Sequence, residues 1–181
     1  SSSEHARQIF IDTLGQSSCP KWFQERKYRI SASTAHAISR ARLLKTRLQY
    51  FFGSLCDLPN FRYGRLQEPY ARKKYEEISG NRVINTGLIV HPNHPWLAAT
   101  PDGLVEDNGQ RICLEIKCPS SSADKEIHVN YIEGETLKRN HPYFTQCQIQ
   151  MFCAQSKESH FFVFSSKDYK LIKVKYDQEF T

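Results

Sequence analysis

The sequence predicts an α/β fold, in which helices flank a β-sheet, and three observations predict it. Helical periodicity dominates the chain up to Gly80. Short β-prone runs bounded by Gly, Pro and Asn follow from Arg82, and another helical segment separates them from a closing pair of strands. We find no internal repeat, low-complexity tract or linker, so we expect a single domain spanning residues 1–181.

Four helical segments are expected before the first loop. They cover 3–14, with Ser3 as N-cap and Gly15 just past the end; 19–29; a third beginning at 30–39, capped by Ser31 or Ser33; and 39–55, with a basic outer face. After a loop at 56–64, residues 65–80 form a further helix. Since Pro69 is tolerated only in a first turn, that helix should begin near Gln67 or Glu68.

The β-prone runs predict three consecutive strands, one helix and a closing hairpin. The strands are expected at 82–90, 96–105 and 111–119, the helix at 140–155 with Pro142 near its first position, and the hairpin strands at 159–166 and 169–176.

Charge favours a polyanionic partner. The formal net charge is +6 and the pI is near 9, and the basic residues gather in "RKYR", "SRARLLKTR" and "ARKK". Such an excess attracts nucleic acid over a distance and releases counterions on binding. A solvated basic face is the alternative interpretation. No segment approaches the roughly 18 apolar residues of a membrane span, so we expect a soluble protein with no membrane partner.

The six cysteines are irregularly spaced and form no CxxC pair, which indicates reduced, buried thiols and not a disulfide framework. The N-terminal "SSSEHARQIF" does not resemble a secretory signal. We therefore expect an intracellular protein that is not secreted, and a nuclear one in a eukaryotic host. His91 and His94 in "HPNHPW" are not expected to bind zinc, because Pro-rich loops commonly carry such histidines.

The stretches "ATPDGLV" and "LEIKCP" place charged residues inside apolar runs. Asn108-Gly109 between them is a strong signal for a two-residue type I′ hairpin turn, and this register sets Asp102 opposite Glu115. Their Cβ atoms would lie roughly 5 Å apart. Two such carboxylates repel unless one is protonated or a cation lies between them, and an oxygen-rich site suits Mg²⁺ or Mn²⁺.

Strand alternation places Lys117 on the same face as Glu115. The other face points into the core and carries Leu114, Ile116 and Cys118. The alternative is that Glu115 and Lys117 form a surface pair on an ordinary hairpin. Against this, residues 101–103 interrupt the strand with Pro-Asp-Gly, and such irregularity often marks a functional bend.

With "TPDG" followed by "EIK", the sequence resembles the PD-(D/E)xK nuclease superfamily, and more narrowly the lambda exonuclease or YqaJ viral recombinase family, from about Trp22 to about Ala154. The resemblance implies a restriction-endonuclease-like core with a central mixed β-sheet flanked by helices. It also implies metal-dependent hydrolysis of DNA, with Mg²⁺ as the cofactor and Mn²⁺ able to substitute.

Further segments extend the resemblance. "WFQERKYRISAS" matches the family segment with a phosphate-binding arginine, which falls on Arg26, and a phosphate-contacting hydroxyl, which falls on Ser33, with Ser31 beside it. A helix N-terminus and a guanidinium are both suited to phosphate. Without the resemblance, Ser33 would be read as a helix cap and Arg26 as solvated. Thr100 falls where the family has a hydroxyl that touches terminal phosphate.

Two helices complete the match. Glu68 in "YGRLQEPYA" falls where the family has a glutamate beside the metals, and "YFTQCQIQM" matches the family's Y-x-x-Q-x-Q helix. By spacing, Tyr143, Gln146 and Gln150 share one face of that helix. Its packing face is expected to carry Ile149, Phe152 and Cys153. Gln146 corresponds to the glutamine next to the scissile phosphate.

The resemblance assigns a role to each site residue. Metal ligands would be Glu68, Asp102, Glu115 and the carbonyl of Ile116; Lys117 would position and help deprotonate the attacking water; Arg26, Ser31, Ser33, Thr100, Tyr143 and Gln146 would bind phosphate or DNA. Asp102, Glu115, Lys117 and Gln146 would form the catalytic set.

The implied activity is 5′-to-3′ degradation of one strand of duplex DNA from ends with a 5′-phosphate, in recombination or repair. A single-strand-annealing protein and a homo-oligomer are the further partners such a family suggests. A structure-specific or single-strand endonuclease is the alternative among enzymes, and a catalytically inactive DNA-binding module is the alternative among other classes.

Overall fold

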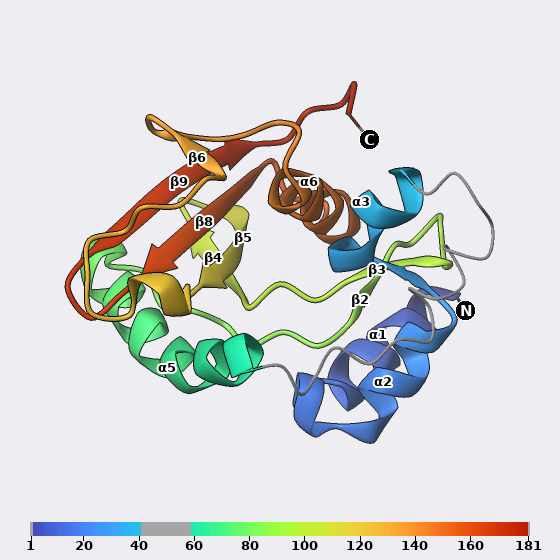
Figure 1. The fold of residues 1–181 in the computed structure, drawn as a ribbon. Coiled ribbons are helices and arrows are strands. Elements are labelled where there is room, and N and C mark those ends of the chain that lie inside the picture. Colours follow the sequence, from blue (N-terminus) through green and yellow to red (C-terminus); the bar gives the residue numbers. More distant parts are fainter. Residues whose placement is uncertain (1, 41–58, 181) are drawn as a thin grey trace.

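The computed structural model of the chain describes residues 2–40 and 59–180 (Figure 1). The helices are α1 (Ser2–Asp12), α2 (Pro20–Lys27), α3 (Ala32–Arg40), α5 (Pro59–Ser79) and α6 (Pro142–Ala154), with 3₁₀ turns at Gln16–Ser18 and Ser120–Ser122. The strands are β1 (Ile30–Ser31), β2 (Ile89–Val90), β3 (Leu97–Ala99), β4 (Gly103–Asp107), β5 (Gln110–Lys117), β6 (Ile132–Glu133), β7 (Thr136–Leu137), β8 (Glu158–Phe164) and β9 (Tyr169–Lys175). The expected helix at 39–55 lies almost wholly outside the described residues.

A four-stranded mixed sheet, in the order β4-β5-β8-β9, carries most of the core. Strand β5 pairs with β8 in parallel, and the two outer pairs are antiparallel. Helix α5 packs Ala71 and Tyr75 against one face of β5, where Leu114 and Ile116 point. Helix α6 covers the other face, so the predicted mixed sheet flanked by helices is confirmed (Figure 1).

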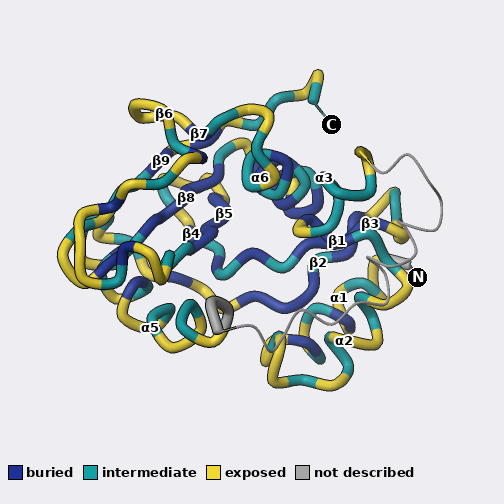
Figure 2. The backbone as a smooth tube through the Cα atoms, in the orientation of Figure 1, coloured by how far each residue is buried: buried dark blue, intermediate teal, exposed yellow. Residues whose placement is uncertain are grey.

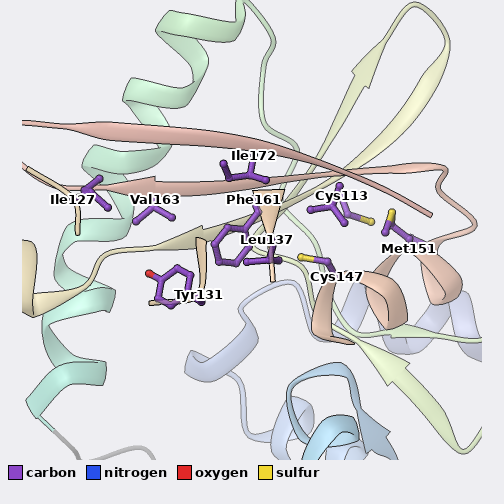
Figure 3. Packing of buried hydrophobic residues seen from close by; sticks show 11 residues of the cluster. Cys113, Ile127, Tyr131, Leu137, Cys147, Met151, Phe161, Val163 and Ile172 are labelled. Atoms are coloured by element: carbon purple, nitrogen blue, oxygen red, sulfur yellow. The ribbon is translucent and has the colours of Figure 1, made fainter. Parts of the chain in front are cut away.

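The α6 face of the sheet forms a tightly packed apolar cluster. Figure 3 shows Cys147 and Met151 of α6 beside Cys113 of β5 and Phe161 of β8. All four side chains are fully buried. Burial of an apolar side chain of this size contributes roughly 1.5–3 kcal/mol, so the cluster fixes how α6 lies on β5.

A second, smaller sheet has the order β1-β3-β2 and lies apart from the first (Figure 1). Strands β3 and β4 are separated only by Thr100–Asp102, so the single strand expected at 96–105 is in fact two strands in two sheets. Pro101 cannot donate a ladder hydrogen bond, which accounts for the break. The run at 82–90 forms only β2 and an isolated bridge between Ile84 and Leu104.

Two helix boundaries differ from the prediction. Helix α1 begins at Ser2, so Ser3 lies inside it, and Gly15 has a right-handed φ of −74° and begins a 3₁₀ turn. Helix α5 begins at Pro59, well before Gln67, and contains Pro69 in its interior. Pro69 and Arg65 are both exposed, so water can solvate the carbonyl of Arg65 that the proline leaves unpaired.

The helix and strands of the C-terminal part agree closely with those predicted from the sequence. Helix α6 begins at Pro142, and the His141 side chain caps it by accepting a hydrogen bond from the Tyr143 N–H at 3.2 Å. Strands β8 and β9 form the predicted hairpin. Strands β3, β5 and β8 are largely buried, whereas β9, at the edge of its sheet, is mostly exposed or half-buried (Figure 2). The short β6–β7 hairpin was not predicted.

The five cysteines within the described residues are free thiols, as expected; Cys113, Cys147 and Cys153 are buried, whereas Cys19 and Cys118 are only half-buried. In the "HPNHPW" loop the His91 Nδ1 accepts the N–H groups of Asn93 and His94, so this histidine shapes the loop. Within residues 2–40 and 59–180, no helix combines the length and apolar character that crossing a membrane requires.

Candidate active site

The β4–β5 hairpin has the predicted turn and register. Asn108 and Gly109 have φ values of 49° and 76°, as a type I′ turn requires, and the ladder runs from Asp107 opposite Gln110 to Gly103 opposite Leu114. Asp102 lies one residue before β4. Its carboxylate accepts the N–H of Ile116 at 2.7 Å, and therefore takes the place of a ladder acceptor where the backbone pairing stops.

Glu115 is buried, with only 3% of its surface exposed. Alternation along β5 directs it toward α6, on the same face as Cys113, so the interpretation as a surface pair on an ordinary hairpin is wrong. Its Oε1 accepts from the Lys117 ammonium at 2.5 Å and from Gln146 Nε2 at 2.7 Å, and its Oε2 accepts from Gln150 Nε2 at 2.6 Å. These charge-assisted hydrogen bonds offset the desolvation of the carboxylate.

Asp102 is a carboxyl group whose ionised form is disfavoured. Burial raises its pKa well above the usual value, and the negative charges of Glu115 and Glu68 add to this effect. Lys117 and the Ile116 N–H act in the opposite direction without cancelling it. Three carboxyl groups (Glu68, Asp102 and Glu115) face two basic side chains (Arg72 and Lys117), as expected of a site completed by a cation.

Arg72 connects helix α5 to the segment that carries Asp102. Its guanidinium donates to the backbone carbonyl of Asp102 at 2.5 Å and to Glu68 Oε1 at 3.4 Å, one helical turn earlier on α5. It also donates to Asn85 Oδ1 at 3.1 Å. Arg72 thus holds Glu68 close to the Thr100–Asp102 segment.

Lys117 lies between Glu115 and Tyr143. Its ammonium is 4.5 Å from the centre of the Tyr143 ring and 3.4 Å from Gln146 Oε1. Burial alone would lower the pKa of Lys117, but the charge of Glu115, with smaller contributions from Tyr143 and Asp102, outweighs burial and raises it. The side chain is therefore a cation in the described state.

The side chains of the site include oxygen donors for a metal ion. Among the residues that the structure describes, no three His, Cys, Asp or Glu side chains form a metal-binding group by themselves. Glu115 is paired with Lys117 and Glu68 with Arg72, so each carboxylate faces a side-chain cation. The oxygen donors and the raised pKa of Asp102 nevertheless fit a hard divalent cation.

A second cluster surrounds Arg26. Its guanidinium donates to the hydroxyls of Ser31 and Ser33, both at 3.2 Å, and stacks 4.2 Å from the centre of the Trp22 ring. The indole N–H of Trp22 donates to Thr100 Oγ1 at 3.0 Å. A cation and two hydroxyls thus lie together where α3 begins, and Trp22 connects them to the hydroxyl of Thr100, two residues before Asp102.

The structure brings the predicted residues into two adjoining groups. One contains Glu68, Asp102, Glu115, Ile116, Lys117, Tyr143 and Gln146, and the other contains Arg26, Ser31, Ser33 and Thr100. Ser31 precedes α3 and exchanges hydrogen bonds with Thr34, whereas Ser33 lies inside the helix.

Three further residues belong to the site that the sequence analysis did not assign to it, although it placed one of them, Gln150, on the helix face of Gln146. They are Trp22, Arg72 and Gln150, and each lies four residues from a predicted site residue on the same helix. That spacing was the available signal, because residues four apart share a helix face.

Comparison with known structures finds the same fold in nucleases. The chain is similar to LHK-Exo in complex with dAMP, with 25% identity, a TM-score of 0.73, and coverage of 88% of this chain and 84% of that chain. It is also similar to an alkaline exonuclease (LHK-Exo) from Laribacter hongkongensis, with 26% identity, a TM-score of 0.69, and coverage of 88% and 83%. A SOX–DNA complex shares the fold alone, with 11% identity, a TM-score of 0.61, and coverage of 97% and 65%. A comparison with curated protein sequences finds no significant match.

Fold and motif together define a PD-(D/E)xK nuclease with the restriction-endonuclease-like core of the lambda exonucleases. Asp102 of the "PD" element and Glu115 and Lys117 of the "ExK" element lie at the end of one hairpin. A model of the YqaJ-like viral recombinase domain matches residues 21–157, and the chain belongs to this family.

Proposed function

We propose that this chain is a metal-dependent deoxyribonuclease that degrades one strand of duplex DNA from a 5′-phosphorylated end, in recombination or repair. The observation that carries the proposal is the pair of carboxylates at the hairpin end, Asp102 and Glu115, with Lys117 hydrogen-bonded to one of them. Family membership and the two LHK-Exo structures support the same activity.

The metal would be held by oxygen donors that adjoin one another in the fold. Asp102 and Glu115 would be the ligands from the hairpin, Glu68 the ligand from α5, and Ile116 would contribute its backbone carbonyl. A bound Mg²⁺, or Mn²⁺ in its place, would activate a water molecule and neutralise charge on the phosphate undergoing hydrolysis.

Lys117 and Gln146 would act on the reacting groups from the α6 side. The raised pKa of Lys117 makes it a hydrogen-bond donor in the described state, so it would orient the attacking water through its N–H groups. Accepting the proton of that water would require a lower pKa than the described state provides. Gln146 would lie beside the scissile phosphate, with Tyr143 packed against Lys117.

The Arg26 cluster would bind the terminal phosphate. Its guanidinium and the hydroxyls of Ser31, Ser33 and Thr100 are the groups that bind phosphate oxygens. Because Thr100 and Asp102 lie in one short segment, a phosphate bound by the cluster would set the position of the strand relative to the carboxylates. The arrangement therefore favours an exonuclease that acts from DNA ends over an endonuclease.

A substrate panel tests the proposal. Linear duplexes with a 5′-phosphate or a 5′-hydroxyl, closed circular DNA and single-stranded DNA are incubated with the protein in Mg²⁺ at fixed salt, since ionic strength alone changes binding. Fast loss of one strand from 5′-phosphorylated duplexes supports the exonuclease. Efficient cutting of closed circles identifies an endonuclease, and failure to cut any DNA identifies an inactive DNA-binding module.

Arg26→Ala is expected to erase the preference for 5′-phosphate over 5′-hydroxyl ends. The lost charge-assisted contact contributes about 1.5–3 kcal/mol, or roughly ten- to a hundredfold in rate. Initial rates on both end types measure the effect. Lys27→Ala is the matched control, because Lys27 follows on the same helix, carries the same charge and lies against the Tyr28 ring. Equal wild-type rates on the two ends would reject binding of a terminal phosphate by the Arg26 cluster.

A further inference from the structure

Gln150 of α6 is fully buried and donates its amide N–H to Glu115 Oε2 at 2.6 Å. Gln146, one turn earlier, donates to Glu115 Oε1 at 2.7 Å. Two amides of the same helix therefore donate hydrogen bonds to the two oxygens of one carboxylate. This arrangement fixes the last torsion of Glu115, which is otherwise broad and poorly defined in a glutamate.

The other end of the Gln150 amide is unusual. Its Oε1 is buried and accepts no hydrogen bond from any described residue. Rotating the amide would bring this oxygen against the Glu115 carboxylate, so the contact with Glu115 dictates the orientation. An unsatisfied buried acceptor costs about 1–3 kcal/mol, a cost that an apolar side chain of the same size would avoid.

Gln148 on the same helix is a buried glutamine with a purely structural role, and it serves as a comparison for Gln150. It is equally buried, its Nε2 donates to the Lys175 carbonyl at 2.9 Å, and its Oε1 accepts the Asp177 N–H at 2.9 Å. Both of its ends are paired, whereas Gln150 is paired only toward Glu115. The unpaired end therefore sets Gln150 apart from a residue that serves packing alone.

The hydrogen bonds also divide the two carboxylate oxygens. Among the described residues, Oε1 of Glu115 accepts from both Lys117 and Gln146, while Oε2 accepts from Gln150 alone. Each carboxylate oxygen has about two acceptor positions, so Oε2 retains one of them. The hydrogen bond from Gln150 therefore determines the direction of the remaining acceptor position on Oε2.

We infer that Gln150 is a positioning residue for the metal site: it holds Glu115 in the orientation from which Oε2 can bind a divalent cation. The inference rests on the proposed metal-dependent function. Partners that orient a ligand in this way change metal affinity about tenfold to a hundredfold when they are removed.

The test compares Gln150→Met with Gln148→Met, which remove the same amide from equally buried positions. Binding of Mn²⁺ to the DNA-free protein is followed by electron paramagnetic resonance, and the Mg²⁺ dependence of hydrolysis is measured in parallel. Gln150→Met is expected to weaken Mn²⁺ binding about tenfold or more and to raise the KM for Mg²⁺ more than it lowers kcat. Gln148→Met is expected to bind Mn²⁺ as the wild type does.

Gln150→Asn is the second variant, because it keeps an amide but retracts it from Glu115; it decides the question if Gln150→Met does not fold. Weakened Mn²⁺ binding by Gln150→Asn, with a folded circular dichroism spectrum, supports the inference. Binding by either folded Gln150 variant within about twofold of wild type overturns the inference and leaves the metal-dependent function intact. A wild-type protein that binds no Mn²⁺ overturns both.

Discussion

Asp102→Asn is expected to abolish DNA hydrolysis. The substitution removes the charge of a carboxylate proposed to bind the metal, and loss of the metal would cost at least about 3 kcal/mol of transition-state stabilisation, a rate loss of more than about a hundredfold. DNA binding should persist, because the Arg26 cluster is untouched. Single-turnover rates and DNA affinity, measured together on a 5′-phosphorylated duplex, separate the two effects.

The same variant should fold normally. Because burial, Glu115 and Glu68 all disfavour the charged form of Asp102, a neutral amide at this position should leave the thermal unfolding midpoint unchanged or raised. Asp107→Asn is the control, since Asp107 ends β4, the strand that Asp102 precedes, and accepts a hydrogen bond from Asn108 at the far end of the hairpin. Hydrolysis by Asp102→Asn at the rate of the control would contradict the assignment of this carboxylate.

Lys117→Ala is expected to lose most turnover while retaining metal and DNA. Its ammonium is proposed to orient the attacking water, and loss of one positioned hydrogen-bond donor costs about a hundredfold to a thousandfold in turnover. Removing it also removes a positive charge beside the Glu115 carboxylate, so metal affinity should be equal or higher. Single-turnover rates at saturating Mg²⁺ and Mn²⁺ binding without DNA are the measurements.

Lys175→Ala is the matched control for this loss of charge, because Lys175 is 76% exposed and pairs with Glu158, which lies at the end of β8 away from Lys117. Its hydrolysis rate should equal that of the wild type. A Lys117→Ala rate within about threefold of wild type would show that this side chain does not act on the reacting groups.

Local signals in the sequence predicted the hairpin and its register. Asn108 and Gly109 determine the turn type, because both residues adopt positive φ angles. The turn type then determines which residues of the two strands face each other. Helix α6 could be predicted equally well, because Pro142 marks its start and the spacing of the glutamines indicates which face carries the amides. These features depend on residues close together in the chain.

Long-range contacts could not be predicted in the same way. Helical spacing put Gln150 on the face of Gln146, but only the packing of α6 on β5 reveals that this face meets a buried Glu115. Likewise, the Arg72 contact with the carbonyl of Asp102 spans 30 residues. The start of α5 was misjudged because the rule against Pro69 assumes that a freed carbonyl is costly, and here the site is exposed.

Metal dependence of hydrolysis tests the central claim most directly. The wild-type protein is incubated with a linear 5′-phosphorylated duplex after treatment with excess EDTA, and Mg²⁺ is then restored. The account predicts no strand loss in EDTA and full recovery when Mg²⁺ is added, with Mn²⁺ also effective. Hydrolysis that continues undiminished in excess EDTA would contradict it.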